Sequence, residues 1–373
     1  MNTQKRTLIV LAGLLALLAA PAAAQITLKT CTVTSNADSG EGTLREAIAN
    51  CNIILFDKDY DGANTIRLAS PLIIEKGPMN IIGPAYITGK DQNGTNHNVV
   101  ISGDTDGDGV GNVQLMQVYS TVNLRNLTLT KGYCGQNCFG PGGTELLHGG
   151  AIYVAPLATL YLEDCTFSDN VASYGGAIYL DRTTQRDSIY AYRVNFLRNS
   201  AQFGGAIGQE PNATVLNRDG QILLIQSRFV DNEAAAGGAI FLIRLNRNLV
   251  IDSSSFLRNK AKAGSAVYIV ESPWVPAVTI SVWPSGCVCH AVRAPGSNVT
   301  EAPATRAGAG AWKRWSMRTF PVNQSAGPFA DACEPACLIS IFPSLTANVS
   351  RRHLLWPPPQ RRHLAIQRKT PGA

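Results

Sequence analysis

Gly149-Gly150-Ala151-Ile152 is the first of four copies of one motif in this 373-residue chain. The other copies are Gly175-Gly176-Ala177-Ile178, Gly204-Gly205-Ala206-Ile207 and Gly237-Gly238-Ala239-Ile240, and a degenerate fifth copy is Gly264-Ser265-Ala266-Val267. Self-similarity at intervals of about 20 to 50 residues is typical of solenoid proteins, whose repeats bury a continuous core only by stacking on one another. The motif therefore predicts a stack of equivalent turns of chain, here called coils.

A second motif, Phe-x-x-Asn, precedes each of the last four copies at one fixed distance. The pairs are Phe167/Asn170, Phe196/Asn199, Phe229/Asn232 and Phe256/Asn259, and every Phe is eight positions before the next Gly. From each Gly to the following Phe the separation varies from 18 to 25 positions. One part of each coil is therefore constant, as a stacked corner must be. The other part accepts insertions, as surface loops do.

Short apolar runs between the motifs predict the strands. Residues 177–180, 239–242 and 266–269 follow the glycine corners, and residues 160–162, 222–225 and 249–251 precede the Phe. Weaker candidates are residues 65–68, 72–74, 80–83, 99–103 and 124–130. Stacked in register, each short run pairs with its equivalents at about 4.8 Å. The predicted fold is all-β, a right-handed parallel β-helix over residues 63–283, with the hand expected from the handedness of parallel crossovers.

Each repeated residue type has a structural role at such a corner. The Gly pair permits a positive φ and a close approach of neighbouring backbones. Each Phe is expected to be one rung of an internal aromatic stack, and each Asn to bond the next coil from a buried turn. The repeat residues are Gly149, Gly150, Phe167, Asn170, Gly175, Gly176, Phe196, Asn199, Gly204, Gly205, Phe229, Asn232, Gly237, Gly238, Phe256, Asn259 and Gly264.

The residue before each Asn alternates in charge along the repeat: Asp169, Arg198, Asp231 and Arg258. If each strand ends just after its Phe, these side chains form an exposed column in which every charge has opposite neighbours. A surface contact of this kind is worth about 0.2–1 kcal/mol, so the column is expected to tune register more than stability.

The N-terminal residues predict export. Lys5 and Arg6 form a positive segment, residues 7–20 are small or apolar, and Ala22-Ala23-Ala24 provides a cleavage site. Residues 1–24 are therefore predicted to be a signal peptide. The alternative is an uncleaved anchor, which is disfavoured because a spanning helix needs about 20 apolar residues. No later segment has the sequence pattern of a membrane span, and the mature protein is expected to be secreted or associated with the cell surface or outer membrane.

Nine cysteines fit an oxidising compartment. Cys31 and Cys51 flank one compact segment and Cys134 and Cys138 lie in one Gly-rich loop, so both pairs are disulfide candidates. Cys165 is expected to be a buried thiol within a strand. Four further cysteines, for which disulfides are favoured over a zinc site beside His290, are Cys287, Cys289, Cys333 and Cys337.

Residues 25–62 are predicted to form an N-terminal cap. Thr43 and Glu46 have the spacing of a capping box, and apolar residues from Leu44 to Cys51 recur at helical intervals. We therefore expect an amphipathic helix from residue 43 to about residue 52. Its apolar face would cover the open end of the coil stack, and a bridge between Cys31 and Cys51 would hold it there.

Charge is unevenly distributed along the chain. The net charge is +6, but residues 284–373 contain eleven Lys and Arg against three Asp and Glu, which leaves −2 on residues 1–283. The predicted β-helix therefore lacks the basic excess that nucleic-acid binding requires. Residues 284–373 form a basic, Pro-rich tail without periodicity and are predicted to be disordered.

Two parts of the sequence resemble known families. Residues 33–40, followed by Thr43-Leu44-Arg45-Glu46-Ala47-Ile48, are similar to the CSLREA-type motif of exported β-helix proteins, with Gly42-Thr43 in place of its Cys-Ser. The paired Gly-Gly-Ala-Ile and Phe-x-x-Asn motifs resemble the repeats of the chlamydial polymorphic outer membrane protein family. Together the two resemblances cover residues 31–270. They imply a surface-exposed or secreted, adhesin-like protein.

β-Helices also carry polysaccharide lyases and hydrolases, which is the alternative function. Such reactions need clustered carboxylates, or an Arg base beside Ca²⁺, on one face of adjacent coils. No carboxylate pair recurs at strand spacing, and His148 has no acidic neighbour in sequence, which favours a corner residue over a catalytic base. A non-enzymatic binding or structural module without a cofactor is therefore favoured. Its partner would be a cell-surface glycan or protein, held by loops at residues 183–187 and 209–219.

Two acidic loops begin like calcium-binding loops. The candidate ligands are Asp57, Asp59 and Asp61 in the first loop and Asp104, Asp106 and Asp108 in the second. Each loop places oxygen ligands on alternate residues before Gly62 or Gly109 at position six. At position twelve, Leu68 and Leu115 stand where a bidentate Glu is needed. Solvated turns are therefore favoured, with weak Ca²⁺ binding as the alternative.

Overall fold

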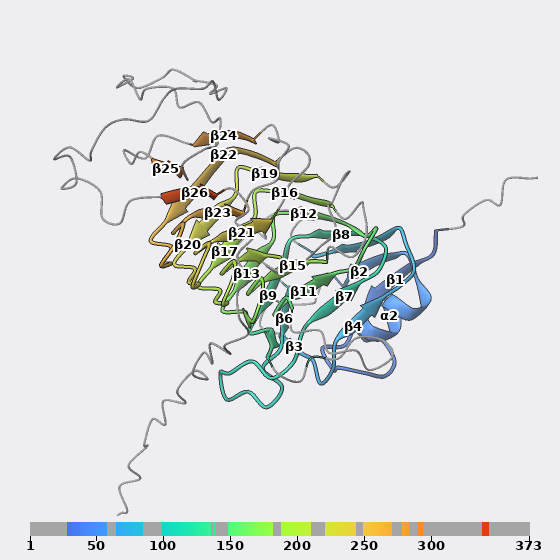
Figure 1. Cartoon of the computed structure of the whole chain (residues 1–373). Helices are drawn as coiled ribbons and strands as arrows, with labels where there is room; N and C mark the ends of the chain where they lie inside the picture. The colour runs from blue at the N-terminus through green and yellow to red at the C-terminus, as the bar shows by residue number, and fades with distance from the viewer. Residues whose placement is uncertain are drawn as a thin grey trace, which may run out of the picture.

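The computed structural model describes residues 28–57, 65–84, 99–135, 138, 148–181, 188–209, 221–243, 249–270, 278–282, 290–293 and 338–342. Within these residues the chain is a parallel β-helix with one short helix, which confirms the predicted fold class (Figure 1). The predicted signal peptide, residues 1–24, lies outside the described residues.

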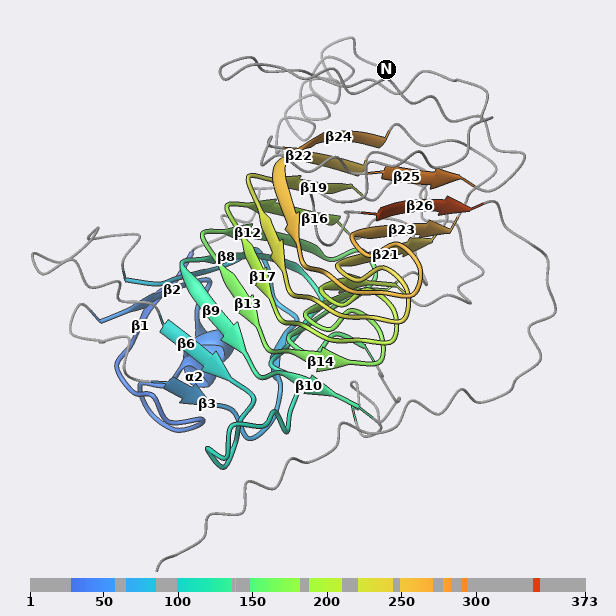
Figure 2. The same ribbon diagram turned by 90° about the vertical axis from the view of Figure 1, so that its left-hand side faces the viewer.

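Three sheets run along the stack, and every strand pair in them is parallel (Figure 2). The first sheet contains β1 (Thr30–Val33), β2 (Ile53–Phe56), β5 (Met79–Ile82), β8 (Thr121–Arg125), β12 (Thr159–Glu163), β16 (Ser188–Tyr192), β19 (Ile222–Ile225), β22 (Leu249–Leu257) and β24 (Val278–Val282). The second contains β3 (Thr65–Arg67), β6 (Val99–Ser102), β9 (Leu127–Thr130), β13 (Thr166–Ser168), β17 (Asn195–Leu197), β20 (Arg228–Val230) and the end of β22. The third contains β4 (Leu72–Ile74), β7 (Met116–Val118), β11 (Ile152–Val154), β15 (Ile178–Leu180), β18 (Ile207–Gly208), β21 (Ile240–Ile243), β23 (Val267–Val270), β26 (Leu338–Phe342) and β25 (His290–Arg293). A short pair, β10 (Tyr133–Cys134) and β14 (Val171–Ala172), lies at a corner.

The repeated Phe residues form the predicted internal stack. Phe167, Phe196, Phe229 and Phe256 align in register across β13, β17, β20 and β22. Adjacent ring centroids are 4.7–5.2 Å apart, with planes 6–13° from parallel. The first three rings are fully buried. Phe167, Phe196 and Phe229 therefore lie in short strands of their own, a third strand per coil that the apolar runs did not predict. Phe256 lies near the end of the longer strand β22.

The glycine corners combine the two expected functions of the Gly pair. The first Gly of each copy has positive φ, for example +68° at Gly204. The second Gly does not, but a Cβ at Gly205 would lie 2.2 Å from the Gly238 carbonyl oxygen of the next coil. The first position is therefore selected by backbone conformation and the second by the close approach of coils.

Two further corners each use one left-handed residue per coil. Asn126, Asp164, Arg193, Gln226 and Ser253 form one column between the first and second sheets, with φ of 50–54°. This corner corrects the strand predicted at residues 124–130, which Asn126 divides into β8 and β9 because it leaves the extended conformation. The second column contains Lys131 and the four residues that alternate in charge.

The predicted charge column is present at that second corner. Arg198 forms a bidentate pair with Asp169, and Arg258 forms one with Asp231, at N–O distances of 2.7–2.8 Å. All four side chains are exposed. Their stabilisation is therefore small, as expected of surface ion pairs.

Helix α2 (Leu44–Asn50) packs at the N-terminal end of the stack (Figure 1). The Thr43 hydroxyl caps it by accepting from the backbone N–H of Glu46, and the Glu46 carboxylate accepts from the Gly42 N–H at 2.7 Å. Leu44, Ala47 and Ile48 are buried, so the apolar face covers the core as predicted. The helix ends at Asn50, before the expected residue 52, because Cys51 is already extended.

Two segments of the tail depart from the expectation of disorder. β26 pairs with β23 and extends the third sheet, and β25 pairs with β26. An apolar run, Leu338 to Phe342, fits this addition because the last strand of a stack leaves a row of unpaired backbone groups. The rest of the tail lies outside the described residues.

Candidate functional site: a tyrosine groove on the first sheet

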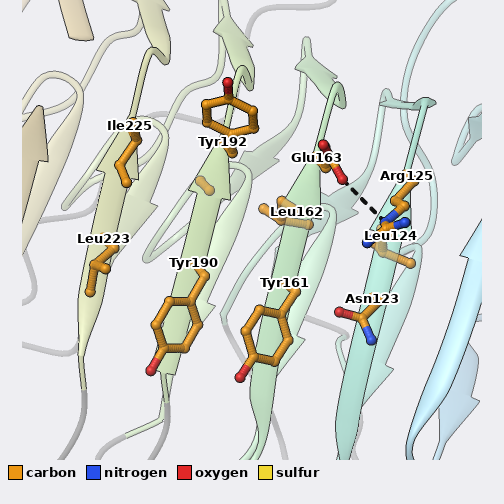
Figure 3. A pocket seen from close by; sticks show the side chains of 11 residues that line it. Asn123, Leu124, Arg125, Tyr161, Leu162, Glu163, Tyr190, Tyr192, Leu223 and Ile225 are labelled. Carbon is orange, nitrogen blue, oxygen red and sulfur yellow. Dashed lines mark ion pairs between the residues drawn. The ribbon is translucent and has the colours of Figure 1, made fainter. Parts of the chain in front are cut away.

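A groove crosses β8, β12, β16 and β19 on the outer face of the first sheet (Figure 3). Its volume is about 250 Å³. One wall is a row of residues aligned by strand register, Asn123, Tyr161, Tyr190 and Leu223. The other wall, two positions further along each strand, is Arg125, Glu163, Tyr192 and Ile225. We call this feature the tyrosine groove.

The groove follows from strand alternation. Leu160, Leu162, Ile189 and Ala191 point into the core and are buried, so the residues between them must point outward. Tyr161 and Tyr192 are 40% and 36% exposed, although outward positions on a solvated sheet are usually polar. The aromatic side chains therefore serve something other than the core.

Tyr161 and Tyr190 form the centre of one wall. Their ring centroids are 4.7 Å apart and their planes differ by 11°. The Tyr190 hydroxyl donates to Gln221 Oε1 at 3.1 Å, which fixes the ring direction. Figure 3 shows the two rings side by side on neighbouring strands. Together they present apolar surface with a hydroxyl at one end of each ring.

The opposite wall carries charges that are already paired. Glu163 bonds Arg125 at 3.2 Å and Arg193 at 3.1 Å. Arg193 also makes a bidentate pair with Asp164 at 2.6 Å, and its guanidinium lies 4.0 Å from the centre of the Tyr192 ring. The hydrogen bonds to Asp164 raise the pKa of Arg193, so this cation remains charged.

This groove was not predicted from the sequence. Residues 160–162 and 222–225 are strand candidates by their apolar character, which does not indicate which outward side chains of different coils become neighbours. The signal was present in the alternation of β12 and β16, where a Tyr occupies the middle outward position of both strands. That these two tyrosines are neighbours follows only from the register of β12 and β16, because the number of residues between coils varies.

The repeat residues lie elsewhere, inside the stack. Asn170, Asn199 and Asn232 are fully buried, Asn259 is nearly so, and the four are linked by side-chain hydrogen bonds. They hold coils together and contribute no surface to the groove. Of the loops expected to bind a partner, residues 183–187 and 210–219 lie outside the described residues. Gln209 is buried and accepts from the Ile243 N–H.

The second acidic loop does bring its three carboxylates together. One oxygen of each of Asp104, Asp106 and Asp108 lies within 4.8 Å of the others. Asp104 is buried and pairs with Lys131 Nζ at 2.9 Å. Burial raises the pKa of Asp104, but Lys131 and the Gly109 and Gly107 N–H groups outweigh it, so the pKa is lowered. A lysine therefore already supplies positive charge where a calcium ion would.

Only part of the first acidic loop is among the described residues. Asp57 follows β2, whereas Asp59 and Asp61 lie outside the described residues. At the second loop, Leu115 is fully buried in the core, which removes position twelve as a ligand.

Both predicted disulfides are present, Cys31–Cys51 and Cys134–Cys138. Cys165 is a buried free thiol, as expected, but lies between β12 and β13 and not within a strand. Burial raises its pKa to about 12, so it is unreactive as a nucleophile. His148 stacks on Tyr179 with ring centroids 4.1 Å apart, consistent with a corner residue.

The buried Phe and Asn columns and the exposed aromatic groove define a repetitive parallel β-helix scaffold. Residues 164–181, which run from the left-handed corner at Asp164 through Phe167, Asn170 and Gly175-Gly176, match the Chlamydia polymorphic membrane protein repeat. That repeat family is associated with the outer membrane and cell surface, and the chain is similar to it over these residues. Neither a curated protein nor a solved structure matches the chain significantly. Among the described residues, no helix has the length and apolar character to cross a membrane.

Proposed function

We propose that the chain is an exported, surface-associated β-helix protein that acts as an adhesin-like binding module, with the tyrosine groove as its contact surface. The observation that supports this most is the exposure of Tyr161 and Tyr192 on a sheet face whose core is complete without them. The repeat match to surface-associated proteins supports the same class of function.

Binding through a repetitive sheet face has a thermodynamic advantage. The groove walls are held by strands that pair on both sides, so little side-chain or backbone order is gained on binding. Affinity for one groove would still be modest because the contact area is small. Presentation of several copies on a surface would raise it through avidity.

The alternative, a polysaccharide lyase or hydrolase, has weaker support in the groove. Glu163 is the only carboxylate among the lining residues, and it is bonded to two arginines. A glycosidase needs two carboxyl groups flanking the scissile bond, one of them protonated. Asp164 is close in sequence but is engaged by Arg193 on two oxygens.

Adhesion of the purified full-length chain to a panel of cell surfaces, measured as retained protein after washing, tests the proposal. We expect the Tyr161→Ser/Tyr190→Ser variant to adhere at least about tenfold less than the wild type, which corresponds to about 1.4 kcal/mol or more for the two substitutions together. Leu257→Ser is the matched control, because Leu257 is an exposed apolar residue of β22 on the second sheet, away from the groove. Equal adhesion of the two variants would contradict the proposal. Release of products from acidic or neutral polysaccharides would instead support the enzyme.

A further inference from the structure

The groove walls restrict what kind of molecule can bind there. Three classes of occupant are a peptide added as a strand, a polyanion and a neutral polymer. The backbone pairing of the strands, the pairing of the charges and the direction of the groove distinguish these classes.

A peptide cannot add to the sheet at the groove as a further strand. β8 is bonded to β5 and β12, β12 to β8 and β16, and β16 to β12 and β19. β19 is likewise bonded to β16 and β22. Strand addition needs an edge with unpaired N–H and C=O groups, and none of these four strands has one. Recognition in the groove must therefore come from side chains.

The charges of the groove select against a polyanion. Glu163 pairs with both Arg125 and Arg193, and Asp164 accepts from Nε and Nη2 of Arg193. Two cations and two carboxylates compensate one another, so no net positive field is directed at a ligand. An acidic ligand would have to compete with Glu163 and Asp164 for guanidinium groups that are already bonded. The charged wall is therefore suited to hydrogen bonding with neutral hydroxyl groups.

The groove also extends along the axis of the stack. Each coil adds one residue to each wall, so a linear polymer lying in the groove meets a new pair of side chains at every strand spacing, about 4.8 Å. The walls combine aromatic rings with hydroxyl, amide and guanidinium groups. This combination matches a ligand that has apolar C–H faces and hydroxyl groups on every unit.

We infer that the tyrosine groove binds a neutral linear glycan, with Tyr161 and Tyr190 as the contacting aromatics and Arg125 and Glu163 as hydrogen-bonding partners. The inference rests on the proposed function and specifies its ligand. Longer oligosaccharides of one type should bind more tightly than short ones until the groove across four strands is filled.

The test is direct binding of the full-length chain to immobilised oligosaccharides. The probes are neutral linear oligomers of glucose, mannose and N-acetylglucosamine in several linkages, with polygalacturonate and heparin as acidic comparators. We expect binding to at least one neutral series, insensitive to salt because no net charge is neutralised. Tyr161→Ala/Tyr190→Ala should raise the dissociation constant at least about tenfold. Tyr161→Phe/Tyr190→Phe should raise it less, because the rings remain, and Leu257→Ala should leave it unchanged.

Several outcomes overturn the inference. They are absence of binding to every neutral series, preferential salt-sensitive binding of the acidic glycans, or wild-type affinity of the Tyr161→Ala/Tyr190→Ala variant when its thermal melt is unchanged. Cell adhesion separates this inference from the proposed function. If adhesion depends on the tyrosines but no neutral glycan binds or competes, the binding function stands and the glycan assignment fails. If adhesion does not depend on them, the function fails as well.

Discussion

Asn232 accepts two hydrogen bonds from Asn199 of the neighbouring coil. The Asn232 Oδ1 atom lies 3.0 Å from both the backbone N and the Nδ2 of Asn199. In turn, Asn232 Nδ2 donates to the Phe196 carbonyl at 3.0 Å and to Asn259 Oδ1 at 2.9 Å. Every polar atom of this buried amide is therefore satisfied by another coil, and the asparagine column acts as a side-chain ladder parallel to the sheets.

Removing one amide should break the ladder on both sides. Asn232→Ala removes the acceptor of the Asn199 backbone N–H and of one of the two Asn199 Nδ2 hydrogens, while the other still donates to the Phe167 carbonyl. It also removes one donor to the Phe196 carbonyl. Each buried group left unpaired costs about 1–3 kcal/mol. Asn232→Asp keeps the acceptor but loses the donor and should also destabilise the fold. Asn195→Ala, a half-buried asparagine of β17, is the control and should cost less than about 0.5 kcal/mol. Urea melts measure all three, and a loss in Asn232→Ala no larger than the control would contradict the ladder's role.

The Phe column makes a packing prediction. Phe196 lies between Phe167 and Phe229, with centroid distances of 5.2 and 4.7 Å, and is fully buried. Phe196→Ala should therefore lower the free energy of unfolding by about 3–5 kcal/mol, and Phe196→Leu by less because it leaves a smaller cavity. A change below about 1 kcal/mol for Phe196→Ala would show that the column does not support the core.

The sequence predicted the fold class because the repeat residues each meet a requirement that only one or two residue types satisfy. The first Gly is required by a corner with positive φ, and the second by a backbone contact too close for a Cβ. The Asn is required by the buried amide ladder. The separate strands around Phe167, Phe196 and Phe229 were not predicted because three residues are too few to show a period. The left-handed corners were not predicted because Arg, Lys, Gln and Ser occupy them together with Asn and Asp. Only Asn and Asp favour positive φ, so no single residue type marks either column.

The tyrosine groove could not be predicted from the sequence for a different reason. Tyr161 and Tyr190 are 29 positions apart, and their contact depends on the register of β12 and β16. Because loops of different lengths separate the coils, no fixed sequence interval reveals this register. Core residues could be inferred one coil at a time, whereas a binding face requires knowing which outward residues of different coils are neighbours.

The second glycine of each pair gives a steric prediction. A Cβ at Gly205 would lie 2.2 Å from the Gly238 carbonyl oxygen, a backbone atom that cannot move without shifting a coil. Gly205→Ala should therefore destabilise the fold by at least about 3 kcal/mol, the upper part of the range for overpacked sites. Ser265 occupies the equivalent position of the last copy and already carries a Cβ, so Ser265→Ala adds no atom at the backbone contact and should destabilise the fold less than Gly205→Ala. Similar melting temperatures for the two variants would contradict the steric account.

The second acidic loop should respond little to calcium. Lys131 already pairs with Asp104, and Leu115 supplies no ligand at position twelve. We expect addition of about 1 mM Ca²⁺ to shift the melting temperature of the wild type by less than about 1 °C, since stabilisation grows only when the concentration exceeds the dissociation constant. A shift that also disappears in Asp106→Asn/Asp108→Asn would show that the loop binds calcium.

The pair of Asp104 and Lys131 predicts opposite pH responses in the wild type and a variant. Because the folded-state pKa of Asp104 is lowered, its contribution to stability is complete above its unfolded value of about 3.8 and is lost as the pH falls through the lower folded value. Lys131→Met keeps the side-chain length and the left-handed backbone but leaves the buried carboxylate without its cation, at a cost of about 1–3 kcal/mol at pH 7.

In the Lys131→Met variant, desolvation dominates and raises the pKa of Asp104. The variant therefore regains part of its free energy of unfolding when Asp104 takes up a proton. Its deficit against the wild type should shrink as the pH is lowered from 7 towards 4, while Lys131→Arg should show almost no deficit at either pH. Urea melts at both pH values measure the difference. A deficit that stays constant or grows on acidification would mean that Lys131 stabilises the corner by packing and not by its charge.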